Sequence, residues 1–301
     1  MSHLSSRRSQ RGFTLVELVV VIVIIGIVSS MVAVFITVPV RSYMDTAARV
    51  ELADIADTAT RRIARDVRLA LPNSVRVGGN GAYLELLLTK TGGRYLSVDD
   101  NIPGNALAFD TDPAPANPTV FTVVGAMPAG VQTIVPGDFI VVNNLGNDPP
   151  VNAYDCSVKC NRGTVAAVNG NDITLAANPF LVVNAADAAM RAMPSLGSRF
   201  QVVTTPVTYF CAPNANGGGT LQRFSGYVIQ ADQPVDASAA PLSNAPVQAA
   251  LAGQVAACSF TFTTLPNVQR GLVGIKLLLG TAGSGGGQIS LVQQAQVNNT
   301  P

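Results

Sequence analysis

One acidic residue lies within a long apolar stretch near the start of the chain. Glu17 is followed by Leu18–Val38, 21 positions without a charged side chain. A carboxylate is costly in hydrocarbon, so an acid inside such a stretch is by default a candidate for function. The alternative is an interfacial acid whose carboxylate lies near lipid headgroups. Glu17 is therefore the first candidate functional residue of the chain.

The chain after the first few residues lacks the histidine that the common catalytic residue combinations need. The only histidine is His3, in the short polar segment at the start. Without another histidine, the rest of the chain has no Ser-His-Asp or Cys-His set and no His-ligated metal. No carboxylate pair stands out for glycoside hydrolysis. We therefore expect no enzyme, no catalytic residue, no metal and no cofactor.

Four cysteines follow the apolar stretch, and their even number indicates disulfides in an oxidising compartment. They are Cys156, Cys160, Cys211 and Cys258. Three pairings are possible. We favour Cys156–Cys160, because the two are close in sequence, and Cys211–Cys258, because both lie in strand-like contexts. A four-cysteine zinc site fits the spacing poorly, and free buried thiols are a further alternative.

Two groups of charged residues offer weaker signals. Acidic turns at Asp99–Asn101 and at Asp110 and Asp112 have calcium-ligand types, but neither matches an EF-hand loop. A row of arginines could form a DNA-binding face, or it could be a solvated face or a contact with acids of neighbouring subunits. Interleaved Asp57 and Asp66 and the lack of nearby aromatics favour the second interpretation. The arginines are Arg61, Arg62, Arg65 and Arg68.

The apolar stretch has the length of a membrane-spanning helix. At about 1.5 Å per residue, Leu18–Val38 spans a bilayer core of about 30 Å. Arg7, Arg8 and Arg11 stand just before it. The positive-inside tendency then places residues 1–12 in the cytoplasm and the rest of the chain across the membrane.

An amphipathic helix follows the membrane segment. Apolar residues recur at three- and four-residue spacing up to Leu71, and Pro72 ends the pattern. We therefore predict a transmembrane helix over residues 13–40 and its amphipathic continuation over 41–71. The predicted buried stripe is Leu52, Ile55, Ala56, Ala59, Ile63, Val67 and Ala70.

Residues 72–301 have the sequence pattern of a β-rich domain, with short apolar runs between turns that contain Gly, Asn and Pro. The expected fold is therefore α+β: a long N-terminal helix, transmembrane and then amphipathic, packed on a β-rich globular domain. A short helix is predicted over Pro246–Ala252, and a hairpin loop over residues 281–288. The predicted strands are Tyr83–Thr89, Val120–Val124, Phe139–Asn143, Gly163–Val168, Arg199–Val203, Val207–Cys211, Leu221–Phe224, Tyr227–Gln230, Ser259–Thr264, Leu272–Leu279 and Gln288–Val297.

The charge balance gives no reason to expect a nucleic acid partner. The 301-residue chain has a net charge of +1, and charged residues make up 12% of it. Residues 1–12 hold three of the 19 basic residues and no acid, so without them the 18 acids are in excess by two. Such a balance does not favour phosphate binding.

The segment R-G-F-T-L-V-E-L resembles the class III signal of type IV pilins and type II secretion pseudopilins. The resemblance implies that residues 1–12 form a leader that a prepilin peptidase removes after Gly12, and that Phe13 is then N-methylated. It also gives Glu17 a partner, the N-terminal amine of a neighbouring subunit. Major pilins often have a proline in the second half of this helix; here Val34 is nearest and Pro39 comes later.

The C-terminal hundred residues, including VTYFC and QRGLVGIKLLL, are similar to the minor pilins of the MSHA (mannose-sensitive haemagglutinin) pilus. This finer resemblance implies a minor pilin that initiates or caps pilus assembly. It implies an inner-membrane start, a periplasmic C-terminal domain and a later place in the pilus at the cell surface. The implied partners are a prepilin peptidase/N-methyltransferase, other major and minor pilins and an inner-membrane assembly platform.

Two alternatives remain open from the sequence. One is a J-type minor pseudopilin of a type II secretion system, which the emerging helix also resembles. The other is a tip adhesin whose β-rich domain binds surfaces or glycans. The chain has no Trp and shows no sequence cluster of aromatics suited to sugar stacking.

Overall fold

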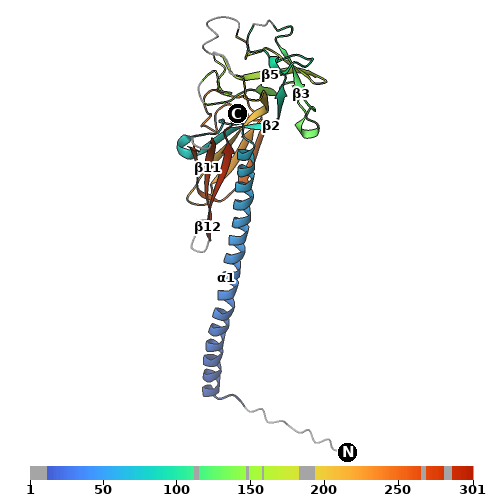
Figure 1. The fold of residues 1–301 in the computed structure, drawn as a ribbon. Coiled ribbons are helices and arrows are strands. Elements are labelled where there is room, and N and C mark those ends of the chain that lie inside the picture. The colour runs from blue at the N-terminus through green and yellow to red at the C-terminus, as the bar shows by residue number, and fades with distance from the viewer. Residues whose placement is uncertain are drawn as a thin grey trace, which may run out of the picture. The chain divides into compact units, whose positions relative to one another are not determined.

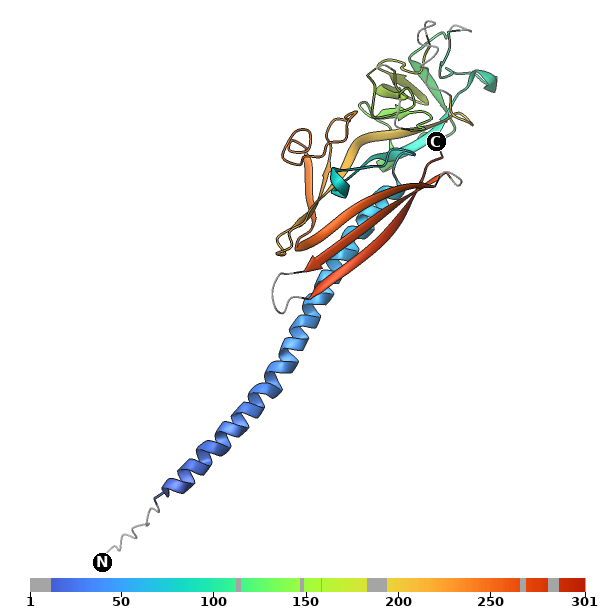
Figure 2. The same ribbon diagram turned by 90° about the vertical axis from the view of Figure 1, so that its left-hand side faces the viewer.

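The computed structural model describes residues 12–111, 115–146, 149–157, 159–182, 194–265, 269–280 and 287–300. The chain forms two compact units, Met1–Glu51 and Leu52–Pro301. Among the described residues, a long helix is joined to strands that form two β-sheets, which establishes the expected α+β fold class. Figures 1 and 2 show the helix and the strands.

Helix α1 spans Leu15–Arg68. Thr14 caps its start, because its Oγ1 accepts a hydrogen bond from the Glu17 backbone N–H at 3.3 Å. Pro39 lies inside the helix, which continues through it although proline has no N–H to donate. Among the described residues, α1 is the one helix long and apolar enough to cross a membrane.

The last part of α1, Leu52–Arg68, packs in the second unit on its apolar stripe. Leu52, Ala56, Ala59, Ile63 and Val67 are buried, as the helical periodicity predicts, while Ile55 is half-buried. The helix ends at Arg68, three residues before the predicted end. The reason is a competing partner: the Leu71 N–H donates to Leu87 O at 2.7 Å, and the Thr89 N–H donates to Leu69 O at 2.9 Å.

The described strands form two antiparallel sheets. The larger has the order β1-β2-β3-β6-β5-β4-β7-β8-β9, with β2 also paired to β7, and the smaller has the order β10-β11-β12. The larger sheet comprises β1 Arg76–Gly78, β2 Tyr83–Tyr95, β3 Val120–Val124, β4 Phe139–Val141, β5 Arg162–Asn169, β6 Asp172–Leu175, β7 Arg199–Ala212, β8 Thr220–Ser225 and β9 Val247–Ala252. The smaller comprises β10 Val255–Leu265, β11 Arg270–Gly280 and β12 Gln288–Asn298.

The helix segment Leu52–Arg68 shares a hydrophobic core with both sheets. Side chains of Ile63 and Val67 belong to the same cluster as Leu84 of β2, Tyr209 of β7 and Ile275 of β11. In Figure 2, the three C-terminal strands cross this part of α1. A second cluster lies among β3–β6 and the other half of the β2–β7 pair, and includes Tyr95, Phe121, Ile140 and Phe200.

Strand β7 is longer than predicted. The sequence predicts two strands, Arg199–Val203 and Val207–Cys211, but Arg199–Ala212 is one strand that continues through Pro206. β7 changes partner at this point: β4 pairs with residues up to Val203, and β8 pairs from Val207 onward. The missing N–H of Pro206 therefore falls where no strand on that side requires a donor.

Two other predictions are wrong. Residues 247–252 form strand β9 and not a helix, because they pair with β8 from Ser225 to Leu221. Tyr227–Gln230 is not a strand; the buried Tyr227 side chain is fixed by its hydroxyl group instead.

Strands β1 and β6 were missed. The predicted hairpin loop falls largely on residues 281–286, outside the described residues, although β11 and β12 pair up to Gly280 and Gln288.

Candidate functional site

Gly12 and Phe13 lie just before α1, in an accessible segment. A Cβ added at Gly12 meets no atom within 4 Å. Phe13 is 81% exposed. The fold of this chain therefore does not itself demand a glycine at position 12, and any requirement for it must come from a molecule that acts on the segment.

Glu17 stands in the first turn of α1. Its backbone N–H bonds to Thr14, and the T-x-x-E spacing is that of a capping box, so part of its role is to start the helix. An acid here also complements the positive end of the helix macrodipole. These two roles require neither a membrane nor a partner subunit. They are therefore an alternative explanation for the acid at position 17.

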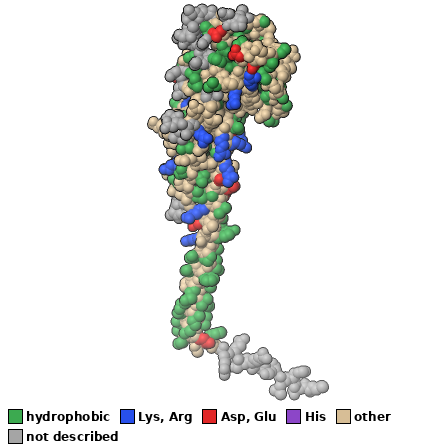
Figure 3. Space-filling view, in the orientation of Figure 1, with side chains coloured by type: hydrophobic (Ala, Val, Ile, Leu, Met, Phe, Trp, Pro, Cys, Tyr) green, Lys and Arg blue, Asp and Glu red, His purple; other side chains and the backbone are tan. Residues whose placement is uncertain are grey.

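The part of α1 before Glu51 presents an apolar surface. All of its residues are exposed in the isolated chain, including Ile22, Ile25, Met31 and Phe35. Figure 3 shows apolar side chains along this part of the helix. A surface of this size is not stable in water. It requires lipid or the apolar surfaces of other helices.

The four cysteines form the two disulfides favoured from the sequence. Cys156 is joined to Cys160, with a Cα–Cα distance of 4.7 Å. Cys211 of β7 is joined to Cys258 of β10, with a Cα–Cα distance of 6.1 Å. The second bond links the larger sheet to the smaller one. It therefore joins the two sheets that pack on the helix segment Leu52–Arg68.

Asp66 is a buried acid on the helix that sequence reasoning did not single out. Its Oδ2 accepts hydrogen bonds from Tyr209 Oη at 2.6 Å and from Arg223 Nε at 3.0 Å. Arg62 Nε lies 3.6 Å from the other carboxylate oxygen. Burial and the adjacent Asp66 carboxylate raise the pKa of Tyr209, so its hydroxyl stays a donor. The set fixes α1 against β7 and β8.

Glu85 of β2 is the centre of a second buried set. It accepts hydrogen bonds from Arg76 Nε at 2.6 Å and from Tyr227 Oη at 2.7 Å. Arg76 also lies over the Tyr154 ring, 3.7 Å from its centroid. Burial raises the pKa of Glu85, and the charge of Arg76 opposes that rise. Both buried acids are partnered, so each serves to hold elements in place.

Some residues of the weaker charged groups have local partners in the structure. Asp100 pairs with Arg94 and accepts the Ser97 N–H at 2.8 Å, so it closes a turn. Asp112 lies outside the described residues. Arg61 pairs with Asp57 at 2.7 Å on the exposed helix face. Within the described residues, no group of three or more His, Cys, Asp or Glu side chains is placed to hold a metal ion.

Comparison with known families identifies the start of the chain. Residues 7–33 match the prokaryotic N-terminal methylation motif. This match covers the arginines before Gly12, the Gly12–Phe13 pair, Glu17 and the first half of the apolar helix. The chain is a type IV pilin-like protein. No curated protein and no solved structure matches it significantly.

This identification gives the described geometry its meaning. Proteins of the pilin family are structural subunits and not enzymes. The motif implies processing by a prepilin peptidase and assembly with other pilins. The apolar part of α1 and the motif together indicate the inner membrane and the pilus as the places where the protein resides.

Proposed function

We propose that this pilin-like protein is a minor pilin of the MSHA type that helps to initiate or cap a pilus. The observation that carries the proposal is the methylation motif on residues 7–33, joined to a single helix that continues to Arg68. The resemblance of the C-terminal hundred residues to the MSHA minor pilins, read from VTYFC and QRGLVGIKLLL, supports the finer assignment.

Processing and docking would proceed at the start of α1. A prepilin peptidase cuts between Gly12 and Phe13 and methylates the new N-terminus. Glu17 then pairs with the N-terminal amine of a neighbouring subunit, because two opposite charges in lipid relieve each other's desolvation cost. The arginines before Gly12 favour a cytoplasmic N-terminus and a periplasmic C-terminal domain.

The size of the C-terminal domain supports a place at the tip. Residues 52–301 form one unit with two sheets around the end of the helix. A domain of this size is difficult to accommodate along a closely packed shaft. A terminal subunit has neighbours on one side only, so it tolerates bulk that a shaft subunit does not.

A J-type pseudopilin of a type II secretion system is the second candidate, because it has the same processing site and helix. Gene neighbours distinguish the two, since MSHA genes and secretion genes stand in different clusters. The direct experiment is to delete the gene, count surface pili by electron microscopy and measure secreted enzymes. Loss of pili with normal secretion is expected. Normal pili with failed secretion would overturn the MSHA assignment.

A further inference from the structure

The last strand of the smaller sheet has an open edge. β12 pairs with β11 in one unbroken register, from Gln288 opposite Gly280 to Asn298 opposite Arg270. On its other side, no strand pairs with β12 among the described residues. Figure 2 shows this three-stranded sheet, with β12 in red. An edge strand presents a row of backbone N–H and C=O groups to which a further strand can bond.

Two hydrogen bonds at the ends of the sheet show which residues of β12 face the open edge. The Asn299 N–H donates to Gln269 O at 3.0 Å, and the Gly280 N–H donates to Gln254 O at 2.9 Å, away from β12. Opposite residues in an antiparallel pair of strands alternate between hydrogen-bonded and non-hydrogen-bonded positions. The even-numbered residues of β12 therefore direct their backbone groups outward. They are Gln288, Ser290, Val292, Gln294, Gln296 and Asn298.

The open edge is fixed in register and lacks the usual protection. The side chains of its outward residues are all exposed. The alternate residues Ile289, Leu291, Ala295 and Val297 pack in the core with the helix, so a slip of β12 by one residue would expose them. Within Gln288–Asn298 there is no charged residue, no proline and no bulge. Charges, prolines and bulges are the features with which natural proteins block an edge.

The opposite edge of the same sheet is covered. A Cβ added at Gly81 would lie 2.9 Å from Phe260 O, so the segment around Gly81 packs directly on the backbone of β10. β10 is also joined to the larger sheet by Cys211–Cys258. Its register shifts between Val255 and Ala257. The chain therefore protects one edge of the smaller sheet and leaves the other open.

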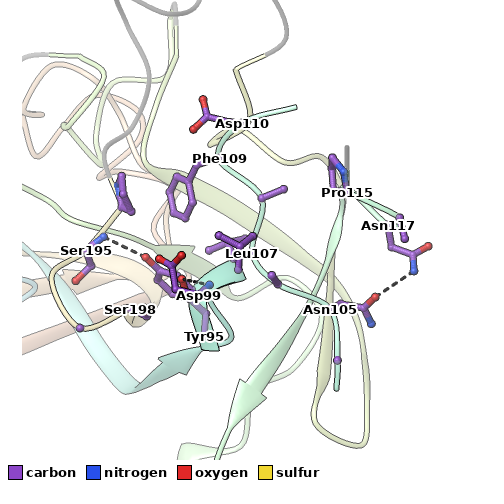
Figure 4. Close-up of a pocket in the computed structure, with 18 of the residues that line it drawn as sticks. Tyr95, Asp99, Asn105, Leu107, Phe109, Asp110, Pro115, Asn117, Ser195 and Ser198 are labelled. Atoms are coloured by element: carbon purple, nitrogen blue, oxygen red, sulfur yellow. Dashed lines mark hydrogen bonds between the residues drawn. The ribbon is translucent and has the colours of Figure 1, made fainter. Parts of the chain in front are cut away.

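The polar groups around the cavity in Figure 4 differ from those of this edge, because they are already bonded within the chain. The cavity has a volume of about 570 Å³. Asn117 Nδ2 donates to Asn105 Oδ1 at 3.1 Å, and the Ser195 N–H donates to Tyr95 Oη at 3.1 Å. Asp110 also has a partner. The outward backbone groups of β12 have no such partner among the described residues.

We propose that the open edge of β12 receives an extended strand of another pilin subunit, which continues the smaller sheet. This inference rests on the proposed function in a pilus. β12 belongs to the sheet that packs on Leu52–Arg68, and this segment continues the helix that bears the methylation motif. A pilin that packs against that segment would lie beside the smaller sheet. Backbone hydrogen bonds would hold the added strand, and the uncharged outward residues would place no like charge opposite it.

The test uses cells that make the full-length protein with a photoreactive benzoylphenylalanine in place of one residue. Gln294 is the test position, because its side chain is exposed on the open edge, and exposed Asn216 is the control position. After illumination, mass spectrometry identifies the protein that is joined to each. An adduct with a different protein that carries the methylation motif is expected at position 294 and not at position 216. No adduct at 294, an adduct with a second copy of this chain, or one with a protein that lacks the motif would overturn the proposal.

Two substitutions block the open edge and leave the pairing with β11 in place. Val292→Pro removes an outward N–H, at the kind of position where edge strands tolerate proline. Ser290→Lys places a charge on the edge, as natural edge strands often do. Each should reduce the adduct at position 294 about tenfold. The matched controls Val292→Thr and Ser290→Thr keep the N–H and add no charge, so they should give the wild-type amount of adduct.

Folding is checked in the same samples by the Cys211–Cys258 disulfide and by the Tm. An undiminished adduct in folded Val292→Pro and Ser290→Lys would refute the edge as the point of contact. If deletion of the gene removes the pili but no adduct forms at position 294, the role in initiation or capping stands and the edge contact is wrong. An adduct with a pilin in a strain whose pili survive the deletion would support the contact and refute that role.

Discussion

Asp66 of α1 and Tyr209 of β7 are joined by a hydrogen bond of 2.6 Å between residues 143 positions apart in the sequence. Both side chains are buried, and Arg223 of β8 completes the set. The helix that carries the assembly motif is thus attached to the larger sheet by a specific polar contact as well as by apolar packing.

Removing this acid should destabilise the second unit strongly. Asp66→Ala leaves Arg223 buried without its partner, which costs about 3–5 kcal/mol. Tyr209→Phe removes one hydrogen bond to a charged group and should cost about 1.5–3 kcal/mol. Thermal unfolding followed by circular dichroism measures both. Asp57→Ala is the control, since its exposed pair with Arg61 is worth at most about 1 kcal/mol. Equal effects of Asp66→Ala and Asp57→Ala would contradict the role of Asp66.

The two disulfides should differ in their contribution to stability. Cys211–Cys258 closes a separation of 47 residues and Cys156–Cys160 a separation of four. The loop-entropy relation then gives about 4 and about 2 kcal/mol. The double Ser variant of each pair, unfolded in urea, tests the order. Peptide mapping without reductant should recover a fragment that joins Cys211 to Cys258. If the Cys156/Cys160 variant is the less stable, the entropic argument fails here.

Gly12→Ala should block processing and leave the fold intact. An added Cβ meets no atom of the chain, so a loss of cleavage reports on the peptidase and not on folding. Mass spectrometry of the membrane fraction should show an excess equal to residues 1–12. Gly26→Ala serves as the control, because that position is equally open. Normal cleavage of Gly12→Ala would refute the assigned processing site.

Glu17→Gln is a sharper test of charge pairing than Glu17→Ala. Glutamine also suits the third position of a helix, so the helix start is preserved while the charge is lost. Processing should continue in either variant, but incorporation into pili should fall. Immunoblots of sheared pili against the membrane fraction measure this. Glu51→Gln, at an exposed helical position, is the matched control. Wild-type incorporation of Glu17→Gln would remove the pairing argument.

Glu85 should make stability depend on pH. Burial raises its pKa in the folded state above the ordinary value of about 4.5, so the unfolded chain loses this proton first as pH rises. The contribution of Glu85 is complete below pH 4.5 and declines as pH passes through the folded-state pKa. The Tm of wild type should therefore fall relative to Glu85→Gln over that window. A constant difference in Tm from pH 4 to pH 8 would show that the folded-state pKa is not raised.

Local patterns in the sequence predicted much of the fold. The buried stripe of α1 and strand Val120–Val124 follow directly from periodicity and flanking turns. The helix predicted over Pro246–Ala252 was wrong because that prediction also used local signals. A proline before an alanine-rich run and a glycine after it are typical of a short helix. The pairing of this segment with β8 overrides those signals. Pairing between distant strands is not encoded in any short window of sequence.

The functional site was predicted unevenly for a related reason. Gly12, Phe13 and Glu17 lie within six positions, so one short motif marks all three as candidates. Asp66, Tyr209 and Arg223 meet only after α1, β7 and β8 have packed, and each looks ordinary in its own segment. The one signal in the sequence was position: Asp66 lies three residues after Ile63 and four before Ala70, so it falls on the apolar stripe of the helix.

The long strand pair β2–β7 has a mechanical consequence. One half of the pair contributes to the core around the helix, and the other half contributes to the second core, among β3–β6. A pull on the part of the domain around β3–β6 would pass to the helix segment Leu52–Arg68 through the backbone pairing of β2 and β7, which continues on both sides of the register shifts between Leu87 and Thr91. Such a connection transmits load without first extending a loop, which suits a subunit that must remain folded under tension.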